Sequence, residues 1–204
     1  RRQVLRRLRE SLARMTGSPL LPAGETVLDY GCGNRPYEEL FRKKFNRYLA
    51  ADLASNPSAE VYADESGRLP VETGSVDCVF SSQVLEHVKI PADYLAEARR
   101  VLKPGGSLIL STHGVWRYHP DPADYRRWTR EGLGLELLQA GFEVQSCEGI
   151  FGLVSSGLQL MQDAVGDRLP CFAGIAWAWL IQSTIGGVER LRDRRNTADA
   201  CIYV

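Results

Sequence analysis

The stretch VLDYGCGNRPYEELF, Val27–Phe41, runs from apolar residues into two closely spaced glycines. Gly31 and Gly33 carry no side chain, so the backbone there can lie close to a ligand. A diphosphate would next require an unobstructed helix N-terminus. Glu38 and Glu39 occupy that first turn instead, where they suit the helix dipole and repel phosphate. The turn therefore favours a ligand that brings no phosphate to it.

Acidic residues follow the next two apolar runs. Asp52 ends RYLAAD, 19 residues after Gly33, and a carboxylate at this place can accept hydrogen bonds from both ribose hydroxyls. Asp64, after a third short run, can accept from an adenine amino group. Pro36 stands where a dinucleotide-binding motif has its third glycine. S-adenosylmethionine carries adenosine and a sulfonium but no phosphate, and it meets these conditions.

The segment STHGVWRYHPDPADYRRWTREGL, 111–133, mixes histidines, aromatic residues and arginines. This mixture suits a polar ring such as a sugar, or an acidic ligand; alternatively, the aromatic residues pack the loop and the arginines are solvated. His113 directly follows an apolar run and is the first candidate for a general base, with His87 and Tyr125 next. A histidine base predicts a rate that falls below about pH 6.5.

The elements that must position these residues alternate along the chain. Near-continuous apolar strands separated by helices predict an α/β fold with a doubly wound, mostly parallel, Rossmann-like sheet of seven strands. Ligands bind such sheets at the carboxyl ends of the strands. The predicted strands are Thr26–Tyr30, Arg47–Asp52, Glu60–Ala63, 75–81, Ser107–Thr112, 142–149 and 200–204, and the helices between them are Pro36–Phe45, Pro91–Leu102 and a helix capped by Thr129 that ends at Ala140, with KPGG as a turn.

We expect residues 1–204 to form a single domain with a cofactor-binding core at 26–148. Residues 1–16 have the spacing of an amphipathic helix, and residues 150–199 predict a helical insertion before the last strand. The run CFAGIAWAWLI in the insertion is broken by polar residues soon afterwards, so no transmembrane span is predicted. A buried hairpin, or a surface for a partner or a hydrophobic substrate, is expected. The first helix and the insertion are expected to cover the cofactor mouth or the substrate entrance.

Composition narrows the class of protein. The 25 basic and 25 acidic residues give a net charge of zero, so no global field recruits nucleic acid or an anionic membrane. The first ten residues are locally basic, so peripheral contact with a membrane stays a possible interpretation. A homodimer is a second possible interpretation. Five dispersed cysteines without a Cys-x-x-Cys pair predict reduced core thiols in a cytoplasmic protein and no metal site.

Four segments resemble, in order, the successive motifs of the class I S-adenosylmethionine-dependent methyltransferases: VLDYGCG, AADL, ADESGRLPVETGSVDCVFSSQVLEHV and EARRVLKPGGSLIL. The resemblance covers roughly residues 26–148 and implies methyl transfer from this cofactor. Arg35 departs from the family pattern, where many relatives have a third glycine, and is expected to contact the cofactor carboxylate or the substrate. The implied cofactor residues are Asp29, Gly31, Cys32 and Gly33 around the methionine end, Asp52 at the ribose, Leu53 on the adenine, Asp64 and Glu65 beside the base, and Ser81, Ser82 and Gln83 under the sulfonium.

The acceptor is expected to be a small molecule. The loop 111–133 resembles loops of methyltransferases that act in surface-polysaccharide or natural-product assembly, which implies O-methylation of a small polar substrate. SSQV stands where amino-methylating nucleic-acid enzymes carry Asn-Pro-Pro-Tyr, so nucleic acid is disfavoured. Two alternatives stay open: a non-catalytic cofactor-binding subunit that supports a partner enzyme, and a nicotinamide-dependent oxidoreductase, which the missing third glycine and the acidic helix start disfavour.

Overall fold

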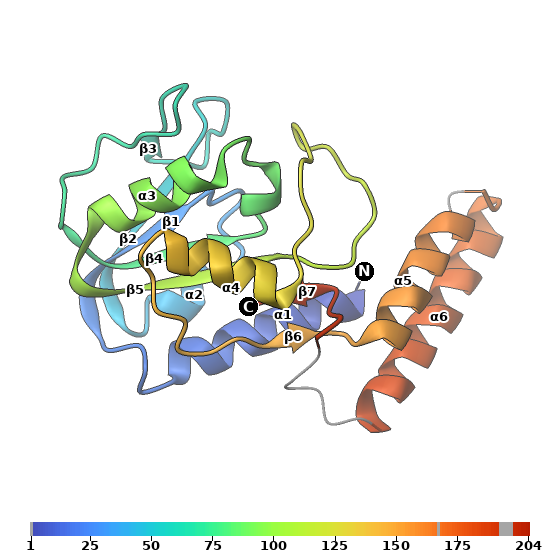
Figure 1. Cartoon of the computed structure of the whole chain (residues 1–204). Helices are drawn as coiled ribbons and strands as arrows, with labels where there is room; N and C mark the ends of the chain where they lie inside the picture. The colour runs from blue at the N-terminus through green and yellow to red at the C-terminus, as the bar shows by residue number, and fades with distance from the viewer. Residues whose placement is uncertain (1, 167, 192–197) are drawn as a thin grey trace.

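A computed structural model describes residues 2–166, 168–191 and 198–204 of the chain. Within these residues seven strands form one sheet in the order β3-β2-β1-β4-β5-β7-β6 (Figure 1). The pairs among β1 to β5 are parallel, whereas β7 pairs antiparallel with both β5 and β6. The strands are β1 Gly24–Tyr30, β2 Phe45–Asp52, β3 Val61–Tyr62, β4 Val76–Ser82, β5 Leu102–His113, β6 Gly149–Ile150 and β7 Ile202–Tyr203.

The central strands are buried on both faces, as their continuous apolar runs predict. In β1, Val27 belongs to one core cluster and the next residue, Leu28, to the other; in β4, Cys78 and Val79 divide in the same way. One cluster includes residues of α1 (Arg2–Gly17) and α2 (Glu38–Phe41), and the other includes residues of α3 (Pro91–Val101) and α4 (Arg130–Gln139). The two layers of helices therefore lie on opposite faces of a doubly wound sheet.

The strand order reverses between β1 and β4, because β1 is followed by a crossover to β2 on one side and β4 continues to β5 on the other. The loops that follow β1 and β4 thus separate at the carboxyl edge of the sheet, which is where ligands bind in such folds. The short 3₁₀ helix η1 (Leu85–His87) follows β4 at this edge.

Three predicted elements differ from the structure. The predicted helix Pro36–Phe45 is only the single turn α2, because the chain turns at Lys44, whose amine contacts the carbonyls of Ser18 and Leu21. The predicted strand 142–149 is mostly irregular and solvent-exposed. Only its end bonds to the last strand: Glu148 exchanges backbone hydrogen bonds with Val204, and Gly149–Ile150 pair with β7. The sequence KPGG lies inside β5 as an irregularity, with Gly105 at φ +77° and a register shift against β4.

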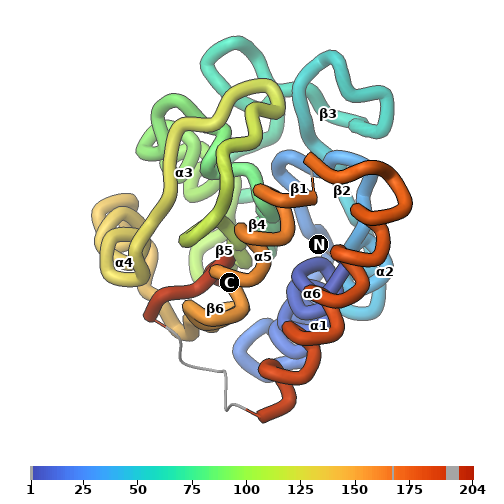
Figure 2. The backbone as a smooth tube through the Cα atoms, turned by 90° about the vertical axis from the view of Figure 1, so that its right-hand side faces the viewer, coloured from blue at the N-terminus to red at the C-terminus, as the bar shows by residue number. Residues whose placement is uncertain are grey.

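Helices α5 (Leu153–Gly166) and α6 (Cys171–Leu191) form a hairpin beyond the β6 edge of the sheet, beside α1 (Figures 1 and 2). Polar side chains bond between its two helices, beside the buried Ile181 and Ile185: Ser155 donates to Glu189 at 2.7 Å, and Gln182 donates to Gln159 at 3.0 Å. The backbone of Gln3 in α1 donates to the Gln182 side chain at 2.9 Å. Many apolar side chains of the hairpin face solvent instead: Leu153, Val154, Met161, Val165, Phe172, Ile175, Trp179 and Leu180.

Among the described residues, α6 is long and apolar enough to cross a membrane, although only by length and composition. The cysteines are free thiols, and Cys171 at the start of α6 is exposed rather than in the core. Residues 167 and 192–197 of the predicted insertion lie outside the described part of the chain.

Candidate active site

The glycine turn after β1 requires its two glycines for different reasons. Gly31 has φ +87°, and a Cβ there would overlap the side chain of Val84 in the loop after β4. Gly33 has φ +49°, and its missing Cβ would meet no atom within 4 Å. The first glycine therefore lets the β1 and β4 loops pack together, and the second leaves open space for a ligand. Cys32 between them is buried.

Asp52 at the end of β2 holds this turn in place. Its Oδ2 accepts hydrogen bonds from the Gly33 N–H at 2.9 Å and from Asn56 Nδ2 at 2.6 Å, and its Oδ1 accepts from the Leu53 N–H at 2.7 Å. Asn56 also donates to the Gly33 carbonyl at 2.9 Å. The structure thus brings Asp52 to the glycine turn, whereas its predicted contact with the ribose stays a prediction. Asn56 was not predicted, because nothing in ASNPSA distinguishes it from a loop residue.

Asp29, two residues before Gly31, is buried within β1, and the hydroxyl of Tyr48 in β2 donates a hydrogen bond to it. Burial raises the pKa of Asp29 from its ordinary value of 3.8 to about 7, against the opposing effect of the Tyr48 hydrogen bond. The carboxyl is therefore poised to ionise near neutral pH when a cation approaches. Tyr48 was not predicted as a partner; only the strand register places it next to Asp29.

Asp29 predicts a pH-dependent stability. Because its folded pKa is raised, its contribution to stability is fully present below about pH 3.8 and is lost as the pH rises through about 7. An Asp29→Asn variant keeps the neutral form at every pH. Between about pH 5.5 and 8 the melting temperature of the wild type should fall several degrees more than that of the variant. Thermal unfolding in matched buffers measures both slopes, and equal slopes would contradict the assignment.

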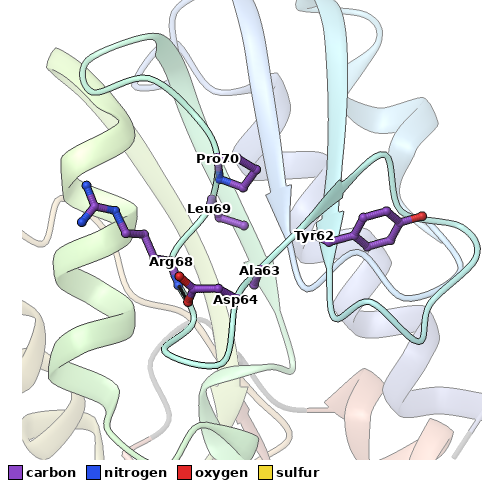
Figure 3. Close-up of a pocket in the computed structure, with 6 residues that line it drawn as sticks. All are labelled: Tyr62, Ala63, Asp64, Arg68, Leu69 and Pro70. Carbon is purple, nitrogen blue, oxygen red and sulfur yellow. Dashed lines mark hydrogen bonds between the residues drawn. The ribbon is translucent and has the colours of Figure 1, made fainter.

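The adenine side of the predicted site borders a cavity of about 320 Å³ beside β3, lined by Tyr62, Ala63, Asp64, Arg68, Leu69 and Pro70 (Figure 3). Oδ1 of Asp64 accepts hydrogen bonds from the Ser66 N–H at 2.9 Å, the Ser66 hydroxyl at 2.6 Å and the Arg68 N–H at 2.9 Å. These bonds lower the pKa of Asp64, so the carboxyl is ionised and faces solvent. Leu53 and Glu65 are also exposed, which leaves all three residues accessible to a ligand.

The three residues at the end of β4 have different surroundings. The Ser81 hydroxyl is fully buried and lies 2.8 Å from the Tyr94 hydroxyl, which donates to the Tyr30 carbonyl. Ser82 lies 2.9 Å from Ser111 through the hydroxyl oxygens, and Gln83 Nε2 donates to the Ser111 hydroxyl at 3.1 Å. The Ser81 side chain thus bonds within the core, whereas Ser82 and Gln83 bond to β5 at the carboxyl edge of the sheet.

Arg35 does not reach toward the open side of the turn. It adopts φ +52°, the region that a glycine would occupy without strain. Its Nε donates to the Ser58 carbonyl at 2.6 Å, and its Nη1 lies 2.9 Å from Glu60 Oε1. These bonds tie the turn to the loop after β2, and the expected contact with a cofactor carboxylate or a substrate stays a prediction.

Three histidines and a glutamate meet beyond the ends of β4 and β5. His113 Nε2 lies 3.3 Å from Glu86 Oε1, and both residues are buried, with exposed fractions of 5% and 0%. The His119 ring centroid lies 4.9 Å from that of His113 and 5.0 Å from that of His87. Glu86 and His119 were not predicted as site residues. Their places, next to His87 and in the same loop as His113, are the only signals the sequence offers.

Burial is the main reason that the pKa of His113 falls from 6.5 to about 3. The imidazole is therefore neutral throughout the physiological range and a weak proton acceptor. The expected fall in rate below about pH 6.5 consequently does not follow from His113. The ring stacks on Trp116 with 5.0 Å between centroids and an angle of 2°, which fixes its orientation.

The loop that contains these residues is held by its own arginines. Arg127 donates to both oxygens of Asp124 at 2.5 and 2.7 Å and to the Arg117 carbonyl at 2.6 Å, and this pairing lowers the pKa of Asp124 well below its usual range. Arg126 donates to the Val88 and Lys89 carbonyls at 3.0 Å. These arginines therefore build the loop, in contrast to the solvated or ligand-binding roles considered from the sequence.

The aromatic residues of the loop divide into two groups. Trp128 is buried and donates its indole N–H to Glu136. Tyr118 and Tyr125 are exposed, although the Tyr125 N–H donates to the Glu86 carbonyl at 2.9 Å. His87 is half-buried, with Nδ1 against the Ala123 carbonyl. The structure thus gathers His87, His113 and Tyr125 around Glu86, while the side chain of Tyr125 points to solvent.

Comparisons with known proteins agree with this geometry. The methyltransferase domain family matches residues 1–146. A probable S-adenosylmethionine-dependent methyltransferase of Mycolicibacterium smegmatis is 31% identical over 144 residues, which cover 63% of this chain and 56% of that protein. A ubiquinone biosynthesis O-methyltransferase of Roseobacter denitrificans is 35% identical over 102 residues, 44% of this chain and 41% of that protein.

Solved structures share the fold. A phosphoethanolamine N-methyltransferase of Haemonchus contortus in complex with S-adenosylhomocysteine superposes with a TM-score of 0.61 at 15% identity, over 97% of this chain and 51% of that one. A methyltransferase of Aquifex aeolicus gives 0.54 at 23% identity, over 69% and 82% of the two chains. The matched regions span between 30% and 56% of the first three curated relatives.

Proposed function

Since the chain belongs to the S-adenosylmethionine-dependent methyltransferase family, we propose that it transfers the methyl group of S-adenosylmethionine to an oxygen of a small polar molecule, such as a sugar or a natural-product intermediate. The glycine turn with Asp52 bonded to Gly33 carries the cofactor assignment. The relative from Roseobacter denitrificans, an O-methyltransferase by name, and the polar histidine cluster next to the turn support an oxygen acceptor.

The cofactor residues have separate tasks in this proposal. Asp52 accepts hydrogen bonds from the ribose hydroxyls, and Leu53 packs on the adenine. The open space at Gly33 receives the methionine end, whose positively charged ammonium group favours the ionised form of Asp29, with the proton released to water. The cavity beside β3 receives the adenine edge, with Asp64 and Glu65 next to it.

Methyl transfer itself is an in-line displacement. The acceptor oxygen forms a bond to the methyl carbon while the carbon–sulfur bond breaks, and the sulfonium becomes a neutral thioether. The hydroxyl proton leaves to a base or to water. Because the leaving group is already activated, the protein chiefly orients the reactants. His113, His87 and Tyr125 are proposed to orient the acceptor, since they lie around Glu86 at the ligand edge. Of these, His87 and Tyr125 are the groups proposed to receive its proton.

The direct test is an incubation of the protein with methyl-labelled S-adenosylmethionine and fractionated lysate. We expect the label in a small polar molecule. Label in the RNA or protein fraction would reject a small-molecule acceptor. Tight cofactor binding without any transfer would reject catalysis and favour a non-catalytic subunit that supports a partner enzyme.

The hairpin α5–α6 is proposed to rest on a membrane surface on the cytoplasmic side. Its polar side chains bond to one another inside, whereas Phe172 and Trp179 are 79% and 73% exposed. This arrangement suits a hydrocarbon environment outside the hairpin. Arg168 and Arg190 at the ends of α6 are exposed and can reach anionic headgroups. Its task there is to hold the enzyme at the membrane surface. The lid predicted from the sequence stays a prediction.

This placement predicts that the protein co-sediments with vesicles that contain anionic lipid. The double variant Phe172→Glu, Trp179→Glu should lose most of this binding, because two charges replace the apolar contact. Leu138→Glu on α4 is the matched control, since Leu138 is a similarly exposed apolar residue on another helix. Light scattering of the same proteins tests the alternative: a wild-type dimer that the double variant abolishes, without vesicle binding, would make the hairpin a homodimer surface.

A further inference from the structure

Glu86 is buried in a way that its protein partners do not explain. Its side chain has no exposed surface, and Oε1 lacks a hydrogen-bond partner among the described residues. Oε2 accepts one bond, from the Thr112 hydroxyl at 2.8 Å. The Nε2 of His113 lies 3.3 Å from Oε1, the unpartnered oxygen. Ionising a buried carboxyl whose oxygen has no hydrogen-bond partner is costly, and a bound cation would offset that cost.

One ligand atom from each of Glu86, His113 and His119 lies within 4.8 Å of the others. We propose that these three side chains bind a divalent transition-metal ion, with Zn²⁺ as the preferred ion. Two imidazoles and one carboxylate are a donor set suited to such ions rather than to Mg²⁺ or Ca²⁺. Zinc bonds of about 2.0–2.2 Å place tetrahedral ligands roughly 3.3 Å apart, the separation of His113 Nε2 and Glu86 Oε1. The ligand atom of His119 has to close from within 4.8 Å to this separation.

The surroundings already orient these ligands. His119 Nδ1 lies 3.1 Å from the Arg117 carbonyl and 3.3 Å from Asp124 Oδ2, contacts that leave Nε2 available to a metal. Arg127 holds Asp124 in turn. Thr112 holds the carboxylate of Glu86, and Trp116 stacks on the His113 ring. The sequence-based prediction of no metal site considered only the cysteines. The three proposed ligands become neighbours only through the pairing of β4 with β5 and the fold of the loop that contains His119.

Three protein ligands leave coordination positions open for substrate. Resting on the proposed function, the bound ion would coordinate the acceptor hydroxyl and lower its pKa. The favoured acceptor class is then a molecule with two neighbouring oxygens, such as adjacent hydroxyls, that can chelate the ion.

The test titrates Zn²⁺ into chelator-treated full-length protein by calorimetry, without cofactor or substrate. A Cys171→Ser background removes the exposed thiol. We expect one equivalent to bind, and binding to weaken at least about 100-fold in His119→Ala and in Glu86→Gln, which each remove a ligand. His87→Ala is the matched control and should retain affinity within about threefold, because its Nδ1 faces the Ala123 carbonyl.

Melting temperatures keep the outcome unambiguous. Metal-free Glu86→Gln should melt at or above the wild-type temperature, since it removes an uncompensated buried carboxylate, and it should gain nothing from Zn²⁺. The absence of one-equivalent binding by the wild type, or equal binding by His119→Ala, overturns the site. Metal binding without methyl transfer would leave the site standing and reject the proposed function. Full methyl transfer by a protein that binds no Zn²⁺ would support the proposed function and reject the metal site.

Discussion

Replacing His113 by alanine should lower turnover by roughly 10²–10⁴-fold, the range typical for losing help with the acceptor proton, while S-adenosylmethionine affinity stays within about threefold. We expect His113 to give this help through the ion proposed to bind it, rather than through its own weakly basic ring. The reason is location: His113 ends β5 beside Glu86 and stacks on Trp116, whereas the glycine turn and Asp52 are built by other residues. Single-turnover kinetics with the identified acceptor and calorimetry with the cofactor measure the two quantities separately.

Companion variants show how His113 acts. A weak base with a pKa of about 3 gives little help as a lone proton acceptor, so we expect His113 to act together with Glu86 and His119. His119→Ala and Glu86→Gln should therefore each lose activity to a similar degree. If His113→Ala alone is impaired, His113 acts by itself. Tyr125→Phe, on an exposed side chain, removes only a hydroxyl and tests the remaining candidate. A His113→Ala enzyme with full turnover would make His113 a structural residue.

The sequence predicted the sheet well because its signal is strong. Residues such as Val27, Leu28 and Val79 are apolar without alternation, which reports burial on both faces. The short outer elements were predicted less well because their sequence signal is weak. Between Phe142 and Glu148 most side chains face solvent, and pairing with β7, not local pattern, decides where β6 begins. The irregularity at Gly105 likewise depends on the register against β4.

The candidate site was predictable where motif spacing determines it. Asp52 and the glycine turn meet because β1 and β2 are neighbouring parallel strands. Contacts that depend on side-chain direction were not predictable. Arg35 turns toward Ser58 and Glu60, and Arg127 turns inward to Asp124. Glu86 can be recognised as a site residue only from the pairing of Ser82 with Ser111, because that register brings Glu86 beside His113.

Replacing Asp52 by alanine should weaken S-adenosylmethionine binding by about 1–3 kcal/mol, the usual loss when charge-assisted hydrogen bonds are removed. This corresponds to roughly 5- to 150-fold in the dissociation constant, which calorimetry resolves. The carboxylate also accepts from Gly33 and Asn56, so part of the loss could come from a loosened glycine turn. The ribose contact therefore needs a variant that loosens the turn without removing the acceptor.

Asn56→Ala provides that comparison. It removes the amide that bonds to Asp52 and to the Gly33 carbonyl but leaves the carboxylate for the ribose, so its loss should be well below that of Asp52→Ala. The ligand supplies a second comparison. The wild type should bind adenosine more tightly than 2′-deoxyadenosine, and Asp52→Ala should not distinguish them, because the partner of the 2′-hydroxyl is gone. If Asn56→Ala matches Asp52→Ala and both proteins still prefer adenosine, Asp52 maintains the turn and another group holds the ribose.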